Sequence, residues 1–362
     1  MSTPTYNFNA GPAALPKEAL QKAQQEFMDF NATGMSVMEL SHRSDDYRQV
    51  HDEAEHLLRE LMDIPAEYEV LFLQGGASLQ FAMLPMNYLH SEATADYIVT
   101  GSWSKKAVKE ATLFGNTHIA ATSENSLFNY IPGEQEIQLS ESPAYIHLTS
   151  NNTIYGTQWQ RFPDTLQTAP LICDMSSDIL SRPVDVSSFA MIYAGAQKNL
   201  GPSGVTVVIR RKDWMPVNEA VPTMLKYETH AKAQSLFNTP PTFAIYMLKQ
   251  VLQWVKDQGG VQSVAAVNKQ KAMRLYNAIE ESNGFYTKHA ATGSESMMNV
   301  TFTLKDEDTT KLFLQKAKEQ GFVGLGGHRS VGGCRASIYN AVPLSSVDAL
   351  AEFMNDFQKN HS

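Results

Sequence analysis

Strand-like and helix-like segments alternate along the middle of the chain, and this alternation restricts the possible folds more than any other feature. Short apolar runs typical of strands occupy residues 69–73, 96–100, 117–121 and 145–148. Residues 79–88 and 102–114 lie between such runs and have the apolar spacing of helices. Strands that alternate with helices predict a mainly parallel sheet with helices on both faces. We therefore expect an α/β fold.

The flanking segments divide the chain into three parts. Helices are predicted at 17–31, 44–62, 243–257 and 261–282, with Ser44 as an N-cap. They are followed by a strand at 298–304, a helix at 308–320, a strand at 335–339 and a helix at 345–358. We expect residues 1–16 to be extended, residues 17–258 to form a large α/β domain, and residues 259–362 to form a smaller α+β domain. The boundary is placed at the Gly259-Gly260 pair.

A single lysine lies in the turn between two further apolar runs. The run at 189–193 leads through small residues to Lys198, and the second run occupies 205–209. A lysine held near buried strands shifts its pKa readily and can then act as a Schiff-base nucleophile. The alternative is an exposed lysine on an ordinary turn.

A carboxylate ends the preceding apolar run, residues 171–174. Ligands bind at the carboxyl ends of strands in parallel α/β sheets, so Asp174 and Lys198 are expected at the same edge. This pair suits pyridoxal 5'-phosphate, because the lysine can bond to the aldehyde and the aspartate can keep the ring nitrogen protonated. The alternative for Asp174 is a turn residue or a helix N-cap.

A glycine pair separates the strand at 69–73 from the helix at 79–88. Gly75 and Gly76 let the backbone approach a ligand closely, and the N–H groups of a helix start can bind an anion. The same pattern is also typical of a plain strand-to-helix connection. Trp103 follows the next strand, where an indole could stack on a flat ring; the alternative is a core tryptophan.

Composition excludes several classes of protein. The 362 residues are 43% hydrophobic and 19% charged, which is ordinary for a globular protein. A net charge of −9 argues against non-specific nucleic-acid binding. Cys173 and Cys334 are too few for a disulfide framework, so a reducing cytoplasm is expected. We see neither a signal peptide nor an apolar run of about 20 residues, and we expect no membrane partner.

Motifs along nearly the whole chain carry a family resemblance. They are Asn7-Phe8, Gly11-Pro12-Ala13, Leu15-Pro16, Glu39, Ser41-His42-Arg43, Ala95-Asp96-Tyr97, Ile179 to Pro183, the Lys198 loop, Phe237 to Phe243, Gly327-His328-Arg329 and Arg335 to Ala341. With these motifs the chain resembles the phosphoserine aminotransferases, a class V group of the fold-type I pyridoxal-phosphate enzymes. In the resembled fold the extended N-terminal segment packs with the small domain.

The resemblance implies a reaction. It is the reversible transfer of an amino group between L-glutamate and 3-phosphohydroxypyruvate, giving O-phospho-L-serine and 2-oxoglutarate for serine biosynthesis. Use of 4-phosphohydroxythreonine in pyridoxine biosynthesis is left open. Lys198 and Asp174 are the implied catalytic residues, and no metal is expected.

The resemblance also implies which residues bind the cofactor. The cofactor-binding residues are Ala77, Ser78, Trp103, Thr153, Asp174, Gln197, Lys198, Asn238 and Thr239. The backbone at Ala77 and Ser78 would bind the cofactor phosphate. In this family the pair equivalent to Asn238 and Thr239 reaches the cofactor of the partner chain, so a homodimer is expected.

Basic loops provide the expected substrate site. A substrate with an α-carboxylate and a distal anion needs two positive centres, and arginine offers a planar fork for either group. We expect Arg335 to bind the α-carboxylate. Arg43, His328 and Arg329, with His42 nearby, are expected to bind the distal anion. The alternative is that they are surface charges.

Two departures from the family pattern and two competing functions remain. Ser78 stands where some relatives carry an arginine, and Ala10 where some carry a hydroxyl. Another class V enzyme is one alternative, either an alanine–glyoxylate aminotransferase or a cysteine desulfurase that uses Cys334. A catalytically silent nucleotide- or phosphate-binding module that uses the Gly75-Gly76 turn is the other.

Overall fold

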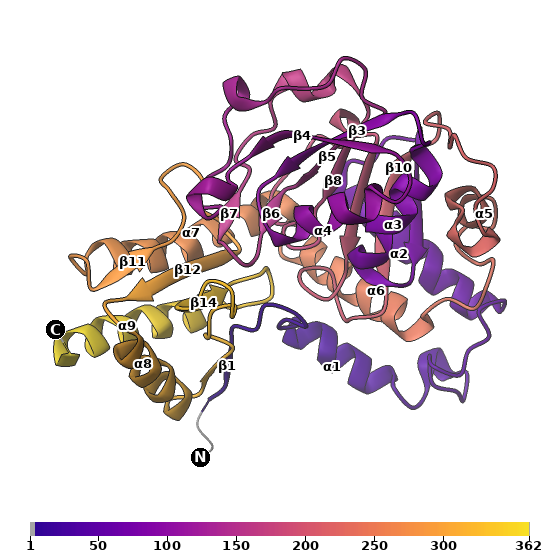
Figure 1. Cartoon of the computed structure of the whole chain (residues 1–362). Coiled ribbons are helices and arrows are strands. Elements are labelled where there is room, and N and C mark those ends of the chain that lie inside the picture. The colour runs from indigo at the N-terminus through magenta and orange to yellow at the C-terminus, as the bar shows by residue number, and fades with distance from the viewer. Residues whose placement is uncertain (1–3, 362) are drawn as a thin grey trace.

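A seven-stranded sheet forms the centre of the molecule (Figure 1). The computed structural model describes residues 4–361, so residues 1–3 of the predicted extended segment lie outside the described part. The strand order is β2-β10-β9-β8-β5-β3-β4. The strands are β2 (Tyr68–Leu73), β3 (Thr94–Val99), β4 (Asn116–Thr122), β5 (Ile146–Thr149), β8 (Leu171–Asp174), β9 (Met191–Gly195) and β10 (Thr206–Arg211).

The sheet is mainly parallel, as predicted, but β10 runs antiparallel to both β2 and β9. A parallel crossover needs about a dozen residues or more, and only residues 196–205 connect β9 to β10. The short lysine loop therefore forces the chain to turn back. Because β10 reverses between them, β2 and β9 point the same way, and the carboxyl ends of β2, β3, β5, β8 and β9 share one edge.

Helices cover both faces of this sheet, as expected. They are α1 (Lys17–Glu26), α2 (Asp45–Met62), α3 (Gly76–Tyr88), α4 (Ser102–Ala111), α5 (Tyr227–Lys232), α6 (Thr242–Asp257) and α7 (Gly260–Glu280). Side chains of α2, α6 and the start of α7 form one apolar core with the sheet. Side chains of α3, α4 and α5 form another with the opposite face.

A second, smaller layer follows the large sheet. It contains the strands β11 (Tyr286–Lys288), β12 (Asn299–Leu304), β13 (Phe322–Val323) and β14 (Cys334–Ser337), and the helices α8 (Glu307–Glu319) and α9 (Leu344–His361). β1 (Tyr6–Asn7) pairs in parallel with β13. Helix α7 contributes Val264 to the core of the large sheet and Leu275 to the second core. The division at residues 258 and 259 stays a prediction.

Helix ends follow local side-chain chemistry. Ser44 accepts a hydrogen bond from the Tyr47 N–H at 3.3 Å, so the predicted N-cap of α2 is confirmed. The predicted helix 17–31 is too long, because α1 ends at Glu26. The Asp29 carboxylate accepts the Gly34 N–H at 2.7 Å and closes a turn that the periodicity of the apolar residues does not reveal.

One buried lysine ties α7 to the chain after β14. Lys271 is fully buried, and its ammonium donates to the carbonyls of Ile338, Tyr339 and Val342 at 2.9, 2.7 and 3.2 Å. We predict that Lys271→Met lowers the free energy of unfolding by about 2–4 kcal/mol, because buried carbonyls lose their donors. Urea denaturation should show a lower midpoint. Lys269→Met is the control, since Lys269 is exposed on the same helix, and an equal effect of both changes would contradict the prediction.

Candidate active site

Four strand ends bring the predicted cofactor residues together at one edge of the sheet. Asp174 ends β8, Lys198 follows β9, and Trp103 lies in the first turn of α4, which follows β3. Thr153 follows β6 (Asn151–Asn152), which pairs with β7 (Thr157–Gln158) just after β5. The predicted edge site is thus formed by segments up to about a hundred residues apart in the sequence.

The Lys198 side chain is half-buried and lies among polar and aromatic groups. Its ammonium donates to Thr153 Oγ1 at 3.4 Å and lies 5.3 Å from the centre of the Trp103 ring. A Cβ atom added to Gly11 would lie 3.3 Å from the Lys198 Cγ, so the N-terminal segment packs against the lysine. Burial lowers the pKa of Lys198 to about 8, opposed by Asp174 and assisted by Arg335. Lys198 is therefore no ordinary surface lysine.

The two carboxylate oxygens of Asp174 have different surroundings. Its Oδ1 accepts from the Ser176 N–H at 3.0 Å and from the Ser176 hydroxyl at 2.6 Å, so the turn alternative is correct for this atom. Its Oδ2 has no hydrogen-bond partner within residues 4–361, although the residue is only 4% exposed. Burial raises the pKa of Asp174, whereas the Ser176 bonds and Lys198 lower it. One oxygen of a largely buried carboxylate side chain is thus free to pair with a donor.

Thr153 connects three of the predicted residues. Its hydroxyl accepts from the Trp103 indole N–H at 3.1 Å as well as from Lys198. Its backbone carbonyl accepts from Arg335 Nη1 at 3.1 Å. The Arg335 Nε is buried without a partner in the described chain. Arg335, on β14, is therefore held at the same site as the lysine, with one donor unused.

The glycine turn places the start of α3 beside the lysine loop. Gly75 has a φ of 88°, and a Cβ atom there would lie 2.5 Å from the Leu79 side chain, so the turn requires glycine. A Cβ atom on Gly195 would lie 3.5 Å from the Ala77 nitrogen and 2.9 Å from Gln197 Oε1. Ala77 and Gln197 thus flank the end of β9. Ser78 lies in the same first turn of α3.

The basic loops divide into two groups. His328 and Arg329 belong to the loop before β14, near Arg335. Burial, followed by the positive charges of Arg335, Arg329 and Lys106, lowers the pKa of His328. His42 and Arg43 precede α2, at the right-hand edge of Figure 1, while the loop before β14 lies on the left. Because the fold separates the two loops within one chain, the expectation that these residues form one distal-anion site stays a prediction.

Asn238 and Thr239 lie beside Gln74, the residue that precedes the Gly75-Gly76 turn of the same chain. The Gln74 side-chain amide donates to the Thr239 carbonyl at 3.3 Å, and Asn238 Nδ2 donates to the same oxygen at 3.1 Å. Asn238 is half-buried and Thr239 is exposed. The predicted contribution of this pair to a partner chain stays a prediction.

Two site residues were missed at the level of the sequence. Ser176 bonds to Asp174 and accepts the Gly195 N–H at 3.0 Å, so it joins the ends of β8 and β9. Its position two residues after Asp174 could have revealed it. Lys106 lies 4.3 Å from the centre of the Trp103 ring, and its three-residue spacing from Trp103 on a predicted helix was the available signal.

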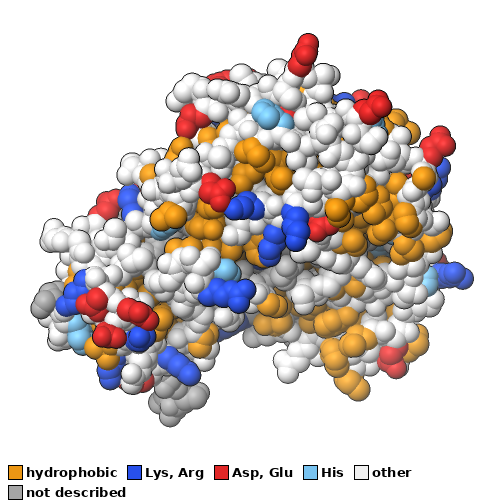
Figure 2. Space-filling view, viewed as in Figure 1, with side chains coloured by type: hydrophobic (Ala, Val, Ile, Leu, Met, Phe, Trp, Pro, Cys, Tyr) orange, Lys and Arg blue, Asp and Glu red, His pale blue; other side chains and the backbone are white. Residues whose placement is uncertain are grey.

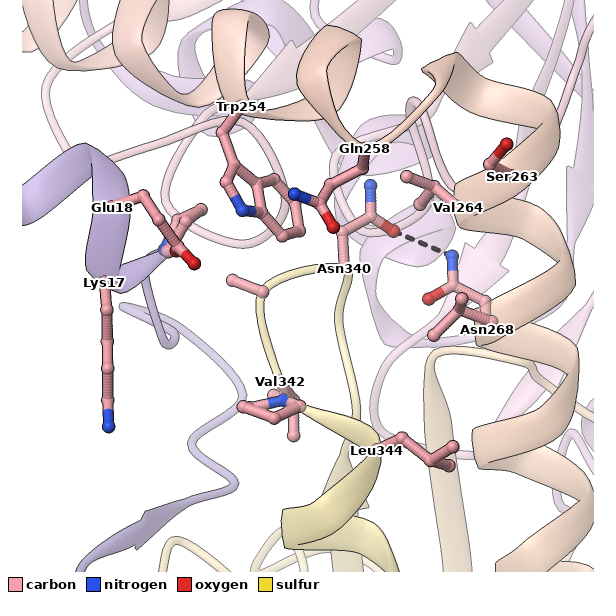
Figure 3. Close-up of a pocket in the computed structure, with 14 residues that line it drawn as sticks. Lys17, Glu18, Trp254, Gln258, Ser263, Val264, Asn268, Asn340, Val342 and Leu344 are labelled. Atoms are coloured by element: carbon pink, nitrogen blue, oxygen red, sulfur yellow. Dashed lines mark hydrogen bonds between the residues drawn. The ribbon is translucent and has the colours of Figure 1, made fainter.

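A cavity also lies away from these residues. A cavity of about 330 Å³ is bounded by residues of α1, α6, α7 and the segment 340–344, among them Trp254 and Asn268 (Figure 3). Asn268 Nδ2 donates to Asn340 Oδ1 across it at 2.8 Å. None of the predicted site residues lines this cavity, so it is separate from the candidate active site.

Cys334 has the surroundings of a structural cysteine rather than of a reactive one. Cys334 lies within β14 and is 1% exposed, and burial raises its pKa to about 12. A reactive thiol needs exposure and a low pKa, so the desulfurase alternative is not favoured.

Residues 4–361 contain no group of three His, Cys, Asp or Glu side chains that could hold a metal ion. No helix in that range is sufficiently long and apolar to span a membrane.

Comparison with known proteins agrees with this geometry. A family model described as Aminotransferase class-V matches residues 5–350. Phosphoserine aminotransferase from Bacillus subtilis (strain 168) is 63% identical over 358 residues, 99% of each chain. The structure of phosphoserine aminotransferase from Bacillus circulans subsp. alkalophilus has a TM-score of 0.97 and 55% identity and covers 100% of both chains.

A more distant relative has the same fold. The PLP-bound phosphoserine aminotransferase from Trichomonas vaginalis has a TM-score of 0.92 at 39% identity, covering 97% of this chain and 100% of that one. Both the family model and the relatives extend over almost the whole sequence. The chain therefore belongs to the class-V aminotransferases and, within them, to the phosphoserine aminotransferase family.

Proposed function

We propose that the protein uses pyridoxal phosphate to transfer an amino group reversibly between L-glutamate and 3-phosphohydroxypyruvate, yielding O-phospho-L-serine and 2-oxoglutarate. The observation that carries this proposal is the position of the Lys198 amine, which contacts Thr153 and Trp103 and is attracted by the carboxylate of Asp174. Burial lowers the pKa of this amine to about 8. High identity to relatives that bear the name of this activity supports the choice of substrates.

The residues present fit the cofactor. Lys198 would hold its aldehyde end, and the free Oδ2 of Asp174 suits a protonated ring nitrogen. The uncapped N–H groups at the start of α3, around Ala77 and Ser78, suit its phosphate. Trp103 offers a flat surface for the ring, while Thr153 and Gln197 offer polar atoms beside it.

The side chains then divide the work. When bound, pyridoxal phosphate supplies an electron sink that stabilises negative charge on the substrate carbon. The lowered pKa of Lys198 would let its amine accept a proton from the Cα of the amino donor near neutral pH, and deliver a proton to the Cα of the new amino acid in the second half-reaction. Asp174 would place a negative charge at the ring nitrogen, and Ser176 fixes the orientation of that carboxylate. Arg335, with an unused Nε donor, binds the α-carboxylate.

A homodimer would complete the distal-anion site. In Figure 1 the chain before α2 and the loop before β14 lie on opposite sides of the molecule, so a second copy would have to bring one basic pair to the other. Large apolar side chains are exposed on α1, on the chain between α1 and α2, and just before α6. They are Leu20, Phe27, Met28, Met35, Met38 and Phe237. Figure 2 shows hydrophobic side chains gathered over α1 and around α2 and α3, as expected for a surface covered by a second copy.

Mixing two inactive variants tests this arrangement. Arg43→Ala and Lys198→Ala dimers should each be inactive or nearly so. If Arg43 acts across the interface, hybrid dimers contain one site with both native residues, and activity should return after subunit exchange. If Arg43 acts within its own chain, every site in the hybrid lacks one residue. Persistent inactivity of hybrids verified by mass spectrometry would contradict the cross-subunit assignment.

One spectroscopic experiment tests the proposed function itself. Purified protein loaded with pyridoxal phosphate should have a visible absorption band that L-glutamate shifts and 3-phosphohydroxypyruvate restores. Alanine and glyoxylate are the control substrates and should act weakly. A colourless protein that binds nucleotide would support the silent-module alternative, and a stronger response to alanine would support the other aminotransferase. A cytoplasmic location and a role in pyridoxine biosynthesis stay predictions.

The lowered pKa of Lys198 gives a pH prediction. Only the neutral amine is a nucleophile, so the initial rate of cofactor incorporation into the cofactor-free protein should rise about tenfold per pH unit below pH 8. It should level off above about pH 8, where Lys198 is neutral. A lysine side chain in a short peptide, whose pKa is about 10.4, is the control. A rate for the protein that continued to rise to pH 10 would contradict the lowered pKa.

A further inference from the structure

Lys106 is a positively charged residue at the site for which the cofactor and the α-carboxylate provide no role. It lies one helical turn after Trp103 on α4, and its ammonium is 4.3 Å from the centre of the indole ring. The Lys198 ammonium lies 5.3 Å from the same ring. Both amines are therefore within cation–π distance of one indole, and Lys106 is a neighbour of the reacting centre.

The Lys106 charge also reaches the basic loop before β14. It is one of the positive charges that lower the pKa of His328, after burial, Arg335 and Arg329. Figure 2 shows Lys and Arg side chains gathered around α4 and the chain before β14. Lys106 is thus close enough to His328, one of the predicted distal-anion residues, to act on it electrostatically.

Lys106 is free to bind an anion, unlike its neighbour on the helix. The Lys105 ammonium pairs with Glu124 Oε1 at 2.5 Å. Within residues 4–361, the Lys106 ammonium has no hydrogen-bond or ion-pair partner, and the side chain is exposed. An unpaired cation beside other cations raises the electrostatic energy of the free protein, and a bound dianion would relieve this repulsion.

We propose that Lys106 is a specificity-determining residue, which binds the phosphate of the phosphorylated substrate and contributes little to the binding of L-glutamate. The inference rests on the proposed function, because it deepens the substrate choice of the same site. A carboxylate is a single negative charge that fits the planar fork of arginine. A phosphate monoester carries nearly two negative charges, so it gains more from an additional point charge such as an ammonium.

The test compares two amino donors on the cofactor-loaded enzyme. Lys106→Met keeps the apolar stem against Trp103 and removes the charge. It should lower kcat/KM for O-phospho-L-serine about 10- to 100-fold, the effect of losing one charge-assisted hydrogen bond. For L-glutamate the change should stay below about threefold. Lys106→Arg should restore most of the activity with O-phospho-L-serine, and Lys105→Met is the matched control, expected to change neither substrate.

Other outcomes separate the possible explanations. If Lys106 only holds Trp103 in place, both substrates lose equally, and the proposal is overturned. No change with either substrate overturns it as well. If the native enzyme does not use O-phospho-L-serine at all, the proposed function fails first. In that case, calorimetry of inorganic phosphate binding tests the role of Lys106 separately from the reaction. Lys106→Met should weaken phosphate binding about tenfold. Equal binding by the native enzyme and the variant overturns the proposal.

Discussion

Lys198→Ala should abolish turnover, with a loss of at least about 10⁴-fold, because one change removes both the nucleophile and the proton carrier. The side chain is half-buried and makes a single hydrogen bond, to Thr153, so the fold should survive its removal. Borohydride reduction followed by peptide mass spectrometry should locate the cofactor on the peptide that contains Lys198 in the native protein. The variant should have no such adduct.

A second variant separates charge from nucleophilicity. Lys198→Arg keeps a positive charge, but a guanidinium cannot lose its proton in a protein. It should therefore be as inactive as Lys198→Ala. If either variant kept both normal turnover and the visible absorption of the cofactor, Lys198 would not be the residue that carries the reaction.

Asp174→Asn should retain the cofactor yet lose about 10²- to 10⁴-fold in kcat, the effect of removing one partner of a buried ion pair. The amide can still accept from Ser176 through its oxygen, so the turn should persist. The other position becomes an NH₂ group, which cannot stabilise a protonated ring nitrogen. Steady-state kinetics, together with a cofactor titration of each variant, measures the two effects separately.

Asp178→Asn is the matched control for this change. Asp178 is also a buried carboxylate on the same turn, but its oxygens already accept from Ser150 and from Gln158 Nε2. The substitution should reduce stability more than kcat. A near-native rate for Asp174→Asn, or an equal loss of kcat for both variants, would remove Asp174 from its role at the ring nitrogen.

Much of the large sheet could be predicted because its strands are buried apolar runs separated by clear helix patterns. The ends of β8 and β9 are local features of the sequence, and this is why the positions of Asp174 and Lys198 at one edge of the sheet could be predicted. The direction of β10 was not predicted, although the length of the lysine loop contains that information. The end of α1 depends on one side-chain contact between Asp29 and Gly34, which apolar spacing cannot reveal.

The substrate site was harder to predict than the cofactor site. Its members come from segments hundreds of residues apart, and a basic pair in a loop has the same appearance whether it faces its own site or a neighbouring molecule. His42 and Arg43 lie in a loop before α2, as predicted, and their contribution to the distal-anion site stays a prediction. Lys106 escaped notice because a lysine on the polar side of a helix is ordinarily a solvated charge.

The bond from Arg335 to position 153 is made through the main chain rather than through the threonine hydroxyl. A mutation at position 153 can therefore remove the hydroxyl that binds the Lys198 amine and the Trp103 indole. The main-chain carbonyl that binds Arg335 remains whatever amino acid occupies the position. A library of replacements at 153 would sample altered chemistry at the reacting carbon while recognition of the common carboxylate is preserved. Evolution has had the same freedom, and relatives with new reactions could retain this arginine and vary its neighbour.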